Sequence, residues 1–229
     1  QLIELKNIYK RYPNGVTALC DVNLEISKGE FVFIIGASGS GKSTLIKLLY
    51  RQEKPSRGEV YVGGVNVSKL RNGKVYKLRR KLGIVFQDYK LLPKLTVYEN
   101  VAFALEVYGL PESDIRKRTL KAIEQVGLKD KLRSYPDELS GGEQQRVVIA
   151  RAIVKDPKIL VLDDSVSAVD VKTEETILHN IQKNRKGKTT ILIASRVSTV
   201  KALDKIIVMN DGKVEAFGTH EECLKNSKT

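Results

Sequence analysis

The fold of this chain is decided by one stretch, Gly36-Ala37-Ser38-Gly39-Ser40-Gly41-Lys42-Ser43. It matches the pattern G-x-x-x-x-G-K-[ST] in full, and it follows a short apolar, β-rich run over Glu30–Ile35. A run with helical spacing, Lys42–Arg51, comes next. Glycines at these positions let backbone N–H groups curl around phosphate oxygens, and the start of the helix adds a favourable dipole. The stretch therefore predicts an α/β fold that binds a nucleoside phosphate.

The loop also predicts roles for single residues. Lys42 is predicted to reach the β- and γ-phosphates of ATP, and Ser43 to hold Mg²⁺. A second metal ligand is predicted at Asp163, because the apolar run Ile159–Leu162 ends there and a buried strand presents such a carboxylate at the edge of its sheet. The predicted ATP contacts of the loop and its flank are Ser38, Gly39, Ser40, Gly41, Lys42, Ser43 and Thr44.

A second helix with a bare start is predicted at Leu139-Ser140-Gly141-Gly142-Glu143. Ser140 can cap this helix, and the two glycines leave its N-terminus open to a phosphate. One small site has no use for two such helix starts. The economical interpretation is a dimer in which each chain's Ser-Gly-Gly helix closes over the nucleotide of the other chain.

Strand-like and helix-like runs alternate at both ends of the 229 residues. The middle has a different texture, since runs of helical spacing follow one another over roughly 88–155. We therefore predict one domain over 1–229: a P-loop NTPase sheet core (1–87 and 156–229) with an N-terminal antiparallel β region, and an inserted α-helical subdomain (88–155). Asn210-Asp211-Gly212 predicts a hairpin, and Thr219 with Glu222 predicts a capping box at the last helix.

These motifs resemble those of the ABC transporter ATPases, whose signature sequence is LSGGE, and the likeness runs from Tyr12 to about Leu224. The resemblance implies that Tyr12 stacks on adenine with Val16 beside it, that Gln87 touches Mg²⁺ and the attacking water, and that Asp170 lies in a loop at the dimer interface. Each has an ordinary alternative: a surface aromatic for Tyr12, a loop amide for Gln87 and a helix cap for Asp170. The implied ligands are ATP and Mg²⁺. The implied signature residues that reach the partner's nucleotide are Ser140, Gly141, Gly142 and Glu143.

Two positions depart from that family's pattern. Asp164 stands where the family has the glutamate that serves as general base, and Ser195 stands where it has a histidine at the γ-phosphate. Because a displacement of about 1 Å can cost on the order of 10²-fold in rate, we expect tight ATP binding and slow hydrolysis. The predicted catalytic set is Lys42, Gln87, Asp164 and Ser195. The alternative is neutral drift, with Asp164 still serving as the base.

The likeness changes character along the chain. Up to about Val161 it resembles the ATPases of cell-division complexes and small-molecule importers, and from Asp163 onward it resembles the degenerate half of heterodimeric exporters. An engineered chimera and an unusual natural subfamily both explain this change. The partners implied are a second ABC ATPase domain, as a homo- or heterodimer, and transmembrane permease subunits that dock near Gln87 and the helical block.

Lys and Arg outnumber Asp and Glu by 40 to 27, a net charge of +13 that invites an anionic partner. The tightest cluster, Lys77–Lys81, is too short to indicate nucleic-acid binding by itself, and Lys42 and Ser140 lie too close in sequence for the long coiled coil of DNA-repair relatives. No nucleic-acid partner is expected. Two distant cysteines fit a reducing compartment, and no apolar run could span a bilayer. We expect a cytoplasmic protein, peripheral on the inner face of the cell membrane.

The predicted function is that of an ATP-binding subunit of an ABC transporter that hydrolyses ATP slowly to drive membrane subunits. The alternative is an ATP-gated dimerisation module whose site binds ATP without useful hydrolysis.

Overall fold

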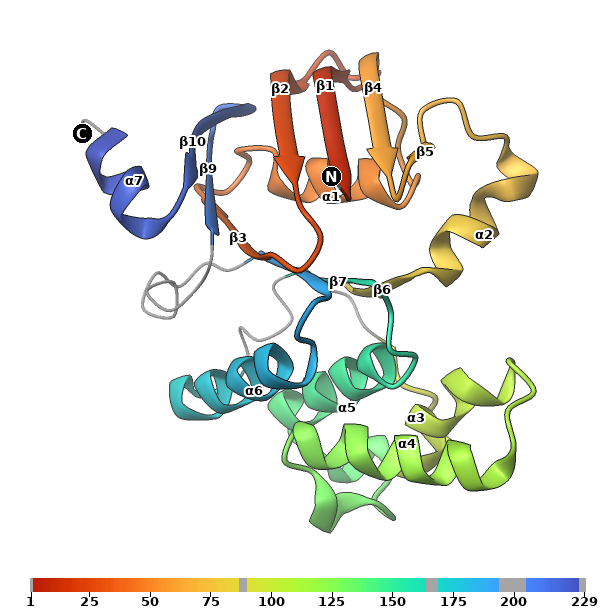
Figure 1. Cartoon of the computed structure of the whole chain (residues 1–229). Helices are drawn as coiled ribbons and strands as arrows, with labels where there is room; N and C mark the ends of the chain where they lie inside the picture. The colour runs from red at the N-terminus through yellow and green to blue at the C-terminus, as the bar shows by residue number, and fades with distance from the viewer. Residues whose placement is uncertain (1, 87–89, 164–168, 194–204, 227–229) are drawn as a thin grey trace. The chain divides into compact units, whose positions relative to one another are not determined.

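A computed structural model describes residues 2–86, 90–163, 169–193 and 205–226 of the chain (Figure 1). They form two compact units. The first contains residues 1–82 and 187–229, and the second contains residues 83–186. The architecture is mixed α/β with sheet cores, as the sequence predicts. The predicted boundaries of the helical subdomain, 88 and 155, stay a prediction.

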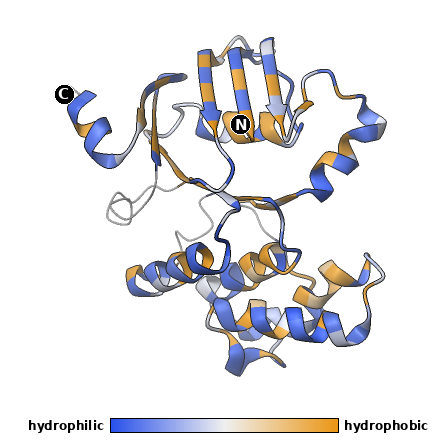
Figure 2. Ribbon diagram, in the orientation of Figure 1, coloured by the Kyte–Doolittle hydropathy of each residue, from blue (hydrophilic) through white to orange (hydrophobic). Residues whose placement is uncertain are grey.

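The first unit holds an antiparallel sheet with the strand order β2-β1-β4-β5 (Figure 1). Buried and exposed side chains alternate along β1 and β2, and Figure 2 shows this as bands of opposite hydropathy. The sheet therefore buries one face, which carries Ile3, Leu5 and Leu24. The strands are β1 (Ile3–Arg11), β2 (Thr17–Ile26), β4 (Arg57–Val62) and β5 (Val65–Asn66).

A parallel group of strands in the same unit leads into the glycine-rich loop. The central strand β3 (Phe31–Gly36) pairs in parallel with β8 (Thr189–Ile193) on one side and with β9 (Lys205–Asn210) on the other. Its first four residues are buried, as expected for a strand covered on both faces. The helix α1 (Lys42–Leu49) follows the loop and packs against β2, β3 and β4.

The C-terminal end of this unit follows the predicted turn chemistry. β9 and β10 (Lys213–Gly218) form an antiparallel hairpin, and both residues of its turn, Asp211 and Gly212, have positive φ. At α7 (His220–Asn226) the backbone N–H of Thr219 donates to Glu222 (2.8 Å), and that of Glu222 donates to the Thr219 hydroxyl (3.3 Å). The predicted hairpin and capping box are confirmed.

The sequence pattern does not predict one short basic helix, α2. The 3₁₀ turn η1 (Asn72–Lys74) leads into α2 (Val75–Arg80). Only two of its side chains, Val75 and Leu78, are buried. A six-residue helix offers too few apolar positions for its periodicity to be recognised.

The second unit is built of helices together with the neighbouring strands β6 (Leu82–Val85) and β7 (Ile159–Asp163). Its helices α3, α4 and α5 pack on one another, and α6 packs on α4. They span Val97–Glu106 (α3), Glu112–Gln125 (α4), Gly141–Ile153 (α5) and Val171–Asn184 (α6), with 3₁₀ turns at Lys129–Lys131 (η2) and Pro136–Glu138 (η3).

Asn100 on α3 fixes the segment that precedes this helix. Its fully buried side chain accepts a hydrogen bond from Leu92 N (2.8 Å) and donates to the carbonyl oxygens of Leu92, Leu95 and Thr96 at 2.9 to 3.1 Å. Because four bonds satisfy the amide, burying it carries little penalty. Among the helices of the described residues, none is long and apolar enough to cross a membrane.

Candidate functional site

The glycine-rich loop joins β3 to α1 within the first unit, in the predicted context. Gly41 is the residue that turns the chain into the helix, with φ of 102°. A Cβ at this position would lie 2.6 Å from the carbonyl oxygen of Ala18 and 2.9 Å from Cδ2 of Leu19. Glycine is therefore required here on two grounds, backbone conformation and space.

The start of α1 suits an anion. No side chain caps the helix, and no acidic residue lies in its first turn. The first backbone N–H groups of a helix have no intrahelical partner, and they carry the positive end of the dipole. Lys42 Nζ lies over the loop, where it donates to the carbonyl oxygens of Gly36 and Ala37 (2.8 Å to Ala37). The loop thus gathers an ammonium group and N–H donors, which is the donor set that phosphate oxygens need.

Tyr12 lies beside this loop. Its hydroxyl forms a hydrogen bond of 3.1 Å with the hydroxyl of Thr44, on the first turn of α1, and Lys10 Nζ lies 5.0 Å from the centre of its ring. The backbone N–H of Tyr12 donates to Val16, whose side chain is 55% exposed. The structure therefore brings Tyr12, Val16 and Thr44 together at one end of the loop. Whether Tyr12 stacks on adenine or is a surface aromatic stays a prediction, since the residue is only partly buried.

The second helix start lies in the second unit, at α5. Ser140 and Glu143 form a complete capping box: Ser140 Oγ accepts from Glu143 N (3.2 Å), and Glu143 Oε2 accepts from Ser140 N (3.0 Å). The predicted cap is confirmed. Gly141 differs from Gly41, since it is exposed, its φ is not positive, and a Cβ on it would meet no atom within 4 Å. Among the described residues, no atom lies close enough to make glycine necessary there.

Asp170 caps α6, which was the ordinary alternative for this residue. Its carboxylate accepts from Thr173 N (3.0 Å) and from the Thr173 hydroxyl (2.6 Å). The bond from that hydroxyl, followed by the bond from the backbone N–H, lowers the pKa of Asp170 below its usual value. A role at a dimer interface is a separate prediction, which the cap does not exclude.

Asp163 ends β7, as predicted, and its side chain is only partly buried whereas the four residues before it are buried. Gln87, Asp164 and Ser195 lie outside the described residues, so their predicted roles stay predictions. Over the described ranges no group of three or more His, Cys, Asp or Glu side chains could hold a metal. The Asp163 carboxylate and the Ser43 hydroxyl are each oxygen donors of the kind that Mg²⁺ prefers, and Mg²⁺ needs few protein ligands when a nucleotide supplies the rest.

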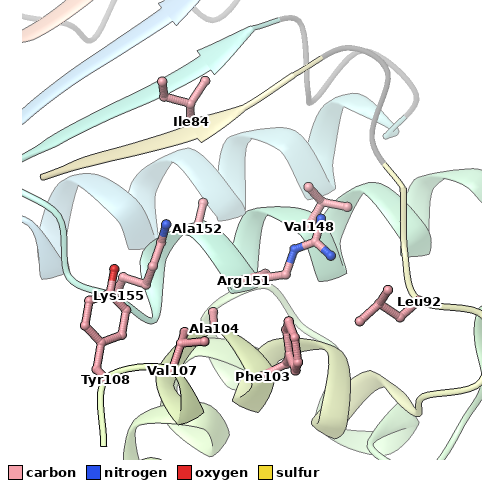
Figure 3. Close-up of a pocket in the computed structure, with 10 residues that line it drawn as sticks. All are labelled: Ile84, Leu92, Phe103, Ala104, Val107, Tyr108, Val148, Arg151, Ala152 and Lys155. Atoms are coloured by element: carbon pink, nitrogen blue, oxygen red, sulfur yellow. The ribbon is translucent and has the colours of Figure 1, made fainter. Parts of the chain in front are cut away.

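A pocket in the second unit was not found from the sequence. It has a volume of about 350 Å³ and lies between α3 and α5 (Figure 3). Residues just after the C-terminal end of each of these helices also line it. Large apolar side chains at its rim are exposed: Phe103 by 47%, Val107 by 72% and Tyr108 by 44%. The sequence pattern that could have indicated it is the clustering of these three large apolar residues at the C-terminal end of one helix. Its lining is Ile84, Leu92, Phe103, Ala104, Val107, Tyr108, Val148, Arg151, Ala152 and Lys155.

Two cations lie in this otherwise apolar lining. Arg151, on α5, donates to the Lys90 carbonyl oxygen (3.1 Å), and Lys155 follows one helical turn later. Burial lowers the pKa of the Arg151 guanidinium. Burial and then the charge of Arg151 lower the pKa of Lys155. No acidic side chain of the described residues lines the pocket, so these residues offer a half-buried positive site to an incoming group.

Comparisons with known proteins agree with this geometry. A profile of the ABC transporter family matches residues 19–167. The chain is 45% identical to the cell division ATP-binding protein FtsE of Bacillus subtilis, over 92% of this chain and 93% of that protein. It is 44% identical to the methionine import ATP-binding protein MetN of Helicobacter pylori, over 99% of this chain and 70% of that protein.

Solved structures give the same result. The dimeric post-hydrolysis state of the ATP-binding cassette MJ0796, bound to ADP and Pi, matches with a TM-score of 0.87 and 37% identity, over 95% of this chain and 98% of that one. A bacterial Atm1-family ABC exporter with ATP bound also matches with a TM-score of 0.87, at 31% identity, and there this chain covers 40% of the other.

Proposed function

The chain belongs to the ABC transporter family as an ATP-binding subunit with ABC-type ATPase activity, and on that premise we propose how its residues do this work. ATP binds the glycine-rich loop of one chain, and the Ser140–Glu143 helix start of a second ABC ATPase domain closes over it. The observation that carries the proposal is Gly141. A glycine that is not required by any described neighbour in its own chain, at an exposed helix start, is explained by close approach of a group from outside the chain.

The roles within the site follow from the donor set. Lys42 and the first N–H groups of α1 bind the β- and γ-phosphates, with Ser38, Gly39, Ser40, Gly41 and Thr44 along the loop. Tyr12 stacks on adenine beside Val16, a role supported by its position next to Thr44. Ser43, Asp163 and Gln87 would hold Mg²⁺, which would neutralise charge that develops on the phosphates.

The chemistry of hydrolysis falls to residues that depart from the usual family pattern. We assign Asp164 as the general base and Ser195 as the group at the γ-phosphate, with Asp170 in the loop that faces the partner. A shorter carboxylate and a hydroxyl in place of an imidazole position water less well, so turnover at this chain's own site is slow. The second candidate, a site that binds ATP and gates dimerisation without useful hydrolysis, rests on the same two positions.

The pocket of the second unit is the proposed dock for a transmembrane permease subunit. Exposed Phe103, Val107 and Tyr108 offer apolar anchor points, and Arg151 and Lys155 favour a carboxylate on the incoming segment. A chain docked in this way lies peripherally on the inner face of the membrane.

Phosphate release from MgATP tests the proposed chemistry, with the natural chain compared with Asp164→Glu plus Ser195→His. We expect the natural chain to bind ATP and turn over below about 0.1 s⁻¹, well under the median for enzymes, and the double variant to gain at least about 10-fold. ATP binding is measured in parallel, so a lost site is not mistaken for a slow one. A natural chain that turns over at about 1 s⁻¹ or faster contradicts the degenerate site and leaves a working ATPase.

A further inference from the structure

One basic surface has no use in the site or the pocket. Between Val60 and Gln87 the sequence contains no Asp or Glu, whereas seven basic residues lie between Lys69 and Lys81. More than half of the net charge of +13 therefore comes from this short segment. It includes η1 and α2, and all of it except its final strand lies in the first unit.

Two of the seven cations form an ion pair or hydrogen bonds with other described residues of the chain. Lys69 forms an ion pair with Glu59 (2.7 Å). Arg79 donates to the carbonyl oxygens of Tyr50 (3.1 Å) and Arg51 (3.4 Å), which ties α2 to the end of α1. The other five are exposed, and no ion pair joins them to an acidic side chain of the described residues. We call this set the α2 basic face: Arg71, Lys74, Lys77, Arg80 and Lys81.

The α2 basic face is held rigidly by its own chain. Val75 and Leu78, three residues apart, point into the unit and are at most 9% exposed. The buried Arg51 donates to the carbonyl oxygens of Val67 (3.1 Å) and Leu70 (3.0 Å) and so fixes the segment that enters η1. The cations therefore project from a fixed surface.

This arrangement has an energetic cost in the free chain. Lys74, Lys77 and Arg80 follow one another at intervals of three residues, and Lys81 lies four residues after Lys77. Like charges at these spacings repel one another on a helix surface. Since no described acidic group relieves them, an anionic surface outside the chain is the natural counterpart.

An exposed aromatic side chain indicates which kind of anionic surface the α2 basic face binds. Tyr76 lies among these cations and is 51% exposed, with the Arg80 guanidinium 5.4 Å from the centre of its ring. An exposed tyrosine surrounded by Lys and Arg suits the headgroup region of a bilayer, where the ring enters the interface and the cations meet phosphates. The face is also short, one 3₁₀ turn and a six-residue helix, and so it lacks the length of an element that tracks a nucleic-acid groove.

We propose that the α2 basic face binds the anionic phospholipid headgroups of the membrane beside the transporter. This contact is separate from ATP binding and from docking of the permease. It gives the subunit a second attachment to the membrane, and the two attachments together raise the effective concentration of the chain at its partner.

The experiment is flotation of the full chain with phosphatidylcholine vesicles that contain about 30% phosphatidylglycerol or none, at about 0.15 M salt. The test variant neutralises the α2 basic face: R71Q, K74Q, K77Q, R80Q and K81Q together. The matched control neutralises five exposed cations of the second unit, Arg116, Lys117, Lys121, Lys172 and Lys183. A further variant exchanges Lys and Arg within the face and so keeps its charge.

We expect the natural chain to bind only the anionic vesicles, and the test variant to lose at least about 100-fold in partitioning, since each cation near such a surface contributes about 5-fold. The control and the charge-keeping exchange should bind within about 3-fold of the natural chain, and Tyr76→Ala should lose several-fold. Equal losses in the test and control variants, or binding to neutral vesicles alone, would overturn the proposal. So would binding of a labelled single-stranded RNA through this face without binding of vesicles.

ATP binding separates this proposal from the proposed function. The test variant should bind ATP as the natural chain does, and Lys42→Ala should lose ATP binding while it keeps its vesicle binding. If the loss of ATP binding also abolishes vesicle binding, the face is not an independent site and the inference is wrong.

Discussion

At the scale of single residues, Gly41 and Gly141 are both at a helix start, yet described neighbours require glycine at only one of them. Gly41 has φ of 102° and no room for a Cβ, whereas a Cβ on Gly141 meets open space. The same substitution should therefore act on stability in one case and on assembly in the other.

We predict that Gly41→Ala costs about 1–3 kcal/mol of stability through backbone strain and abolishes ATP binding. Gly141→Ala should change the free energy of unfolding by less than about 1 kcal/mol, because alanine suits a helix better than glycine. It should keep ATP binding yet lose ATP-dependent association of two chains. Chemical denaturation, nucleotide titration and analytical ultracentrifugation make the comparison. A Gly141→Ala chain that still dimerises with ATP contradicts the closing role of this helix.

At the scale of elements, α5 serves two proposed sites from its two ends. Its N-terminus carries the capping box of Ser140 and Glu143, and its C-terminal half contributes Val148, Arg151 and Ala152 to the pocket. If both proposals hold, docking at the pocket and closure over a partner's nucleotide would be linked through one packed helix. Just beyond the end of this helix, Lys155 supplies the half-buried charge from which the behaviour of the free pocket can be predicted.

Lys155→Met should stabilise the isolated chain by about 0.5–1 kcal/mol while weakening its complex with the membrane subunits, because it removes a half-buried cation that a partner carboxylate would meet. The sign with pH follows from the lowered pKa. Between the folded pKa of Lys155 and its ordinary value of 10.5, the unfolded chain binds more protons, so native stability rises with pH there.

The advantage of Lys155→Met should therefore shrink as pH rises through that window, as thermal unfolding at several pH values would reveal. The control is Lys158→Met, at an exposed position just beyond α5. A stability gain of Lys155→Met that stays constant with pH would assign the effect to packing. Unchanged assembly with the membrane subunits would show that Lys155 does not contribute to the docking surface.

At the scale of the whole molecule, the proposed head-to-tail dimer would make each ATP site a product of two chains. In a pair formed from Lys42→Ala and Gly141→Ala, one composite site combines the intact loop of the second chain with the intact helix start of the first. We predict that each variant alone loses ATP-dependent dimerisation and that an equimolar mixture regains it in part, to about half of the natural level at most. A mixture that stays monomeric would exclude this pairing. The control is Lys42→Ala alone, at the same total protein concentration as the mixture.

The regular elements could be predicted where one local pattern dominates. The buried run of β3, the loop after it, the Ser140 cap and the Asp211-Gly212 turn each follow from a few neighbouring residues, and all four were found. Alternation in the sequence predicts a strand only over Val22–Ile26. The strand β2 begins five residues earlier, because Thr17–Asp21 is irregular in its pairing with β1 and lacks clean alternation. The short helix α2 is not predicted, because six residues show no clear periodicity. The sequence pattern predicts a helix over Glu174–Lys183, whereas α6 begins at Val171 because Asp170 caps it.

Some parts of the candidate site could be predicted from the sequence and others could not. The glycine-rich loop is contiguous, so spacing alone defines it. The contact of Tyr12 with Thr44 joins residues 32 positions apart, and only the fold brings them together. The pocket was beyond reach for the same reason, since its lining combines residues from β6, α3 and α5 that share no sequence pattern.

The exposed turn η1 has a consequence for how the protein ages. Asn72 and Gly73 stand side by side there, and the side-chain amide of an asparagine before glycine cyclises readily onto the following backbone nitrogen, leaving aspartate or isoaspartate. Asn100, buried and held by four hydrogen bonds, is protected from this chemistry. Deamidation at Asn72 would introduce the first carboxylate into a segment that has none. During storage, the positive charge at this turn should therefore decrease, and the peptide that contains Asn72 should gain mass. The affinity of the protein for anionic vesicles should fall over the same period.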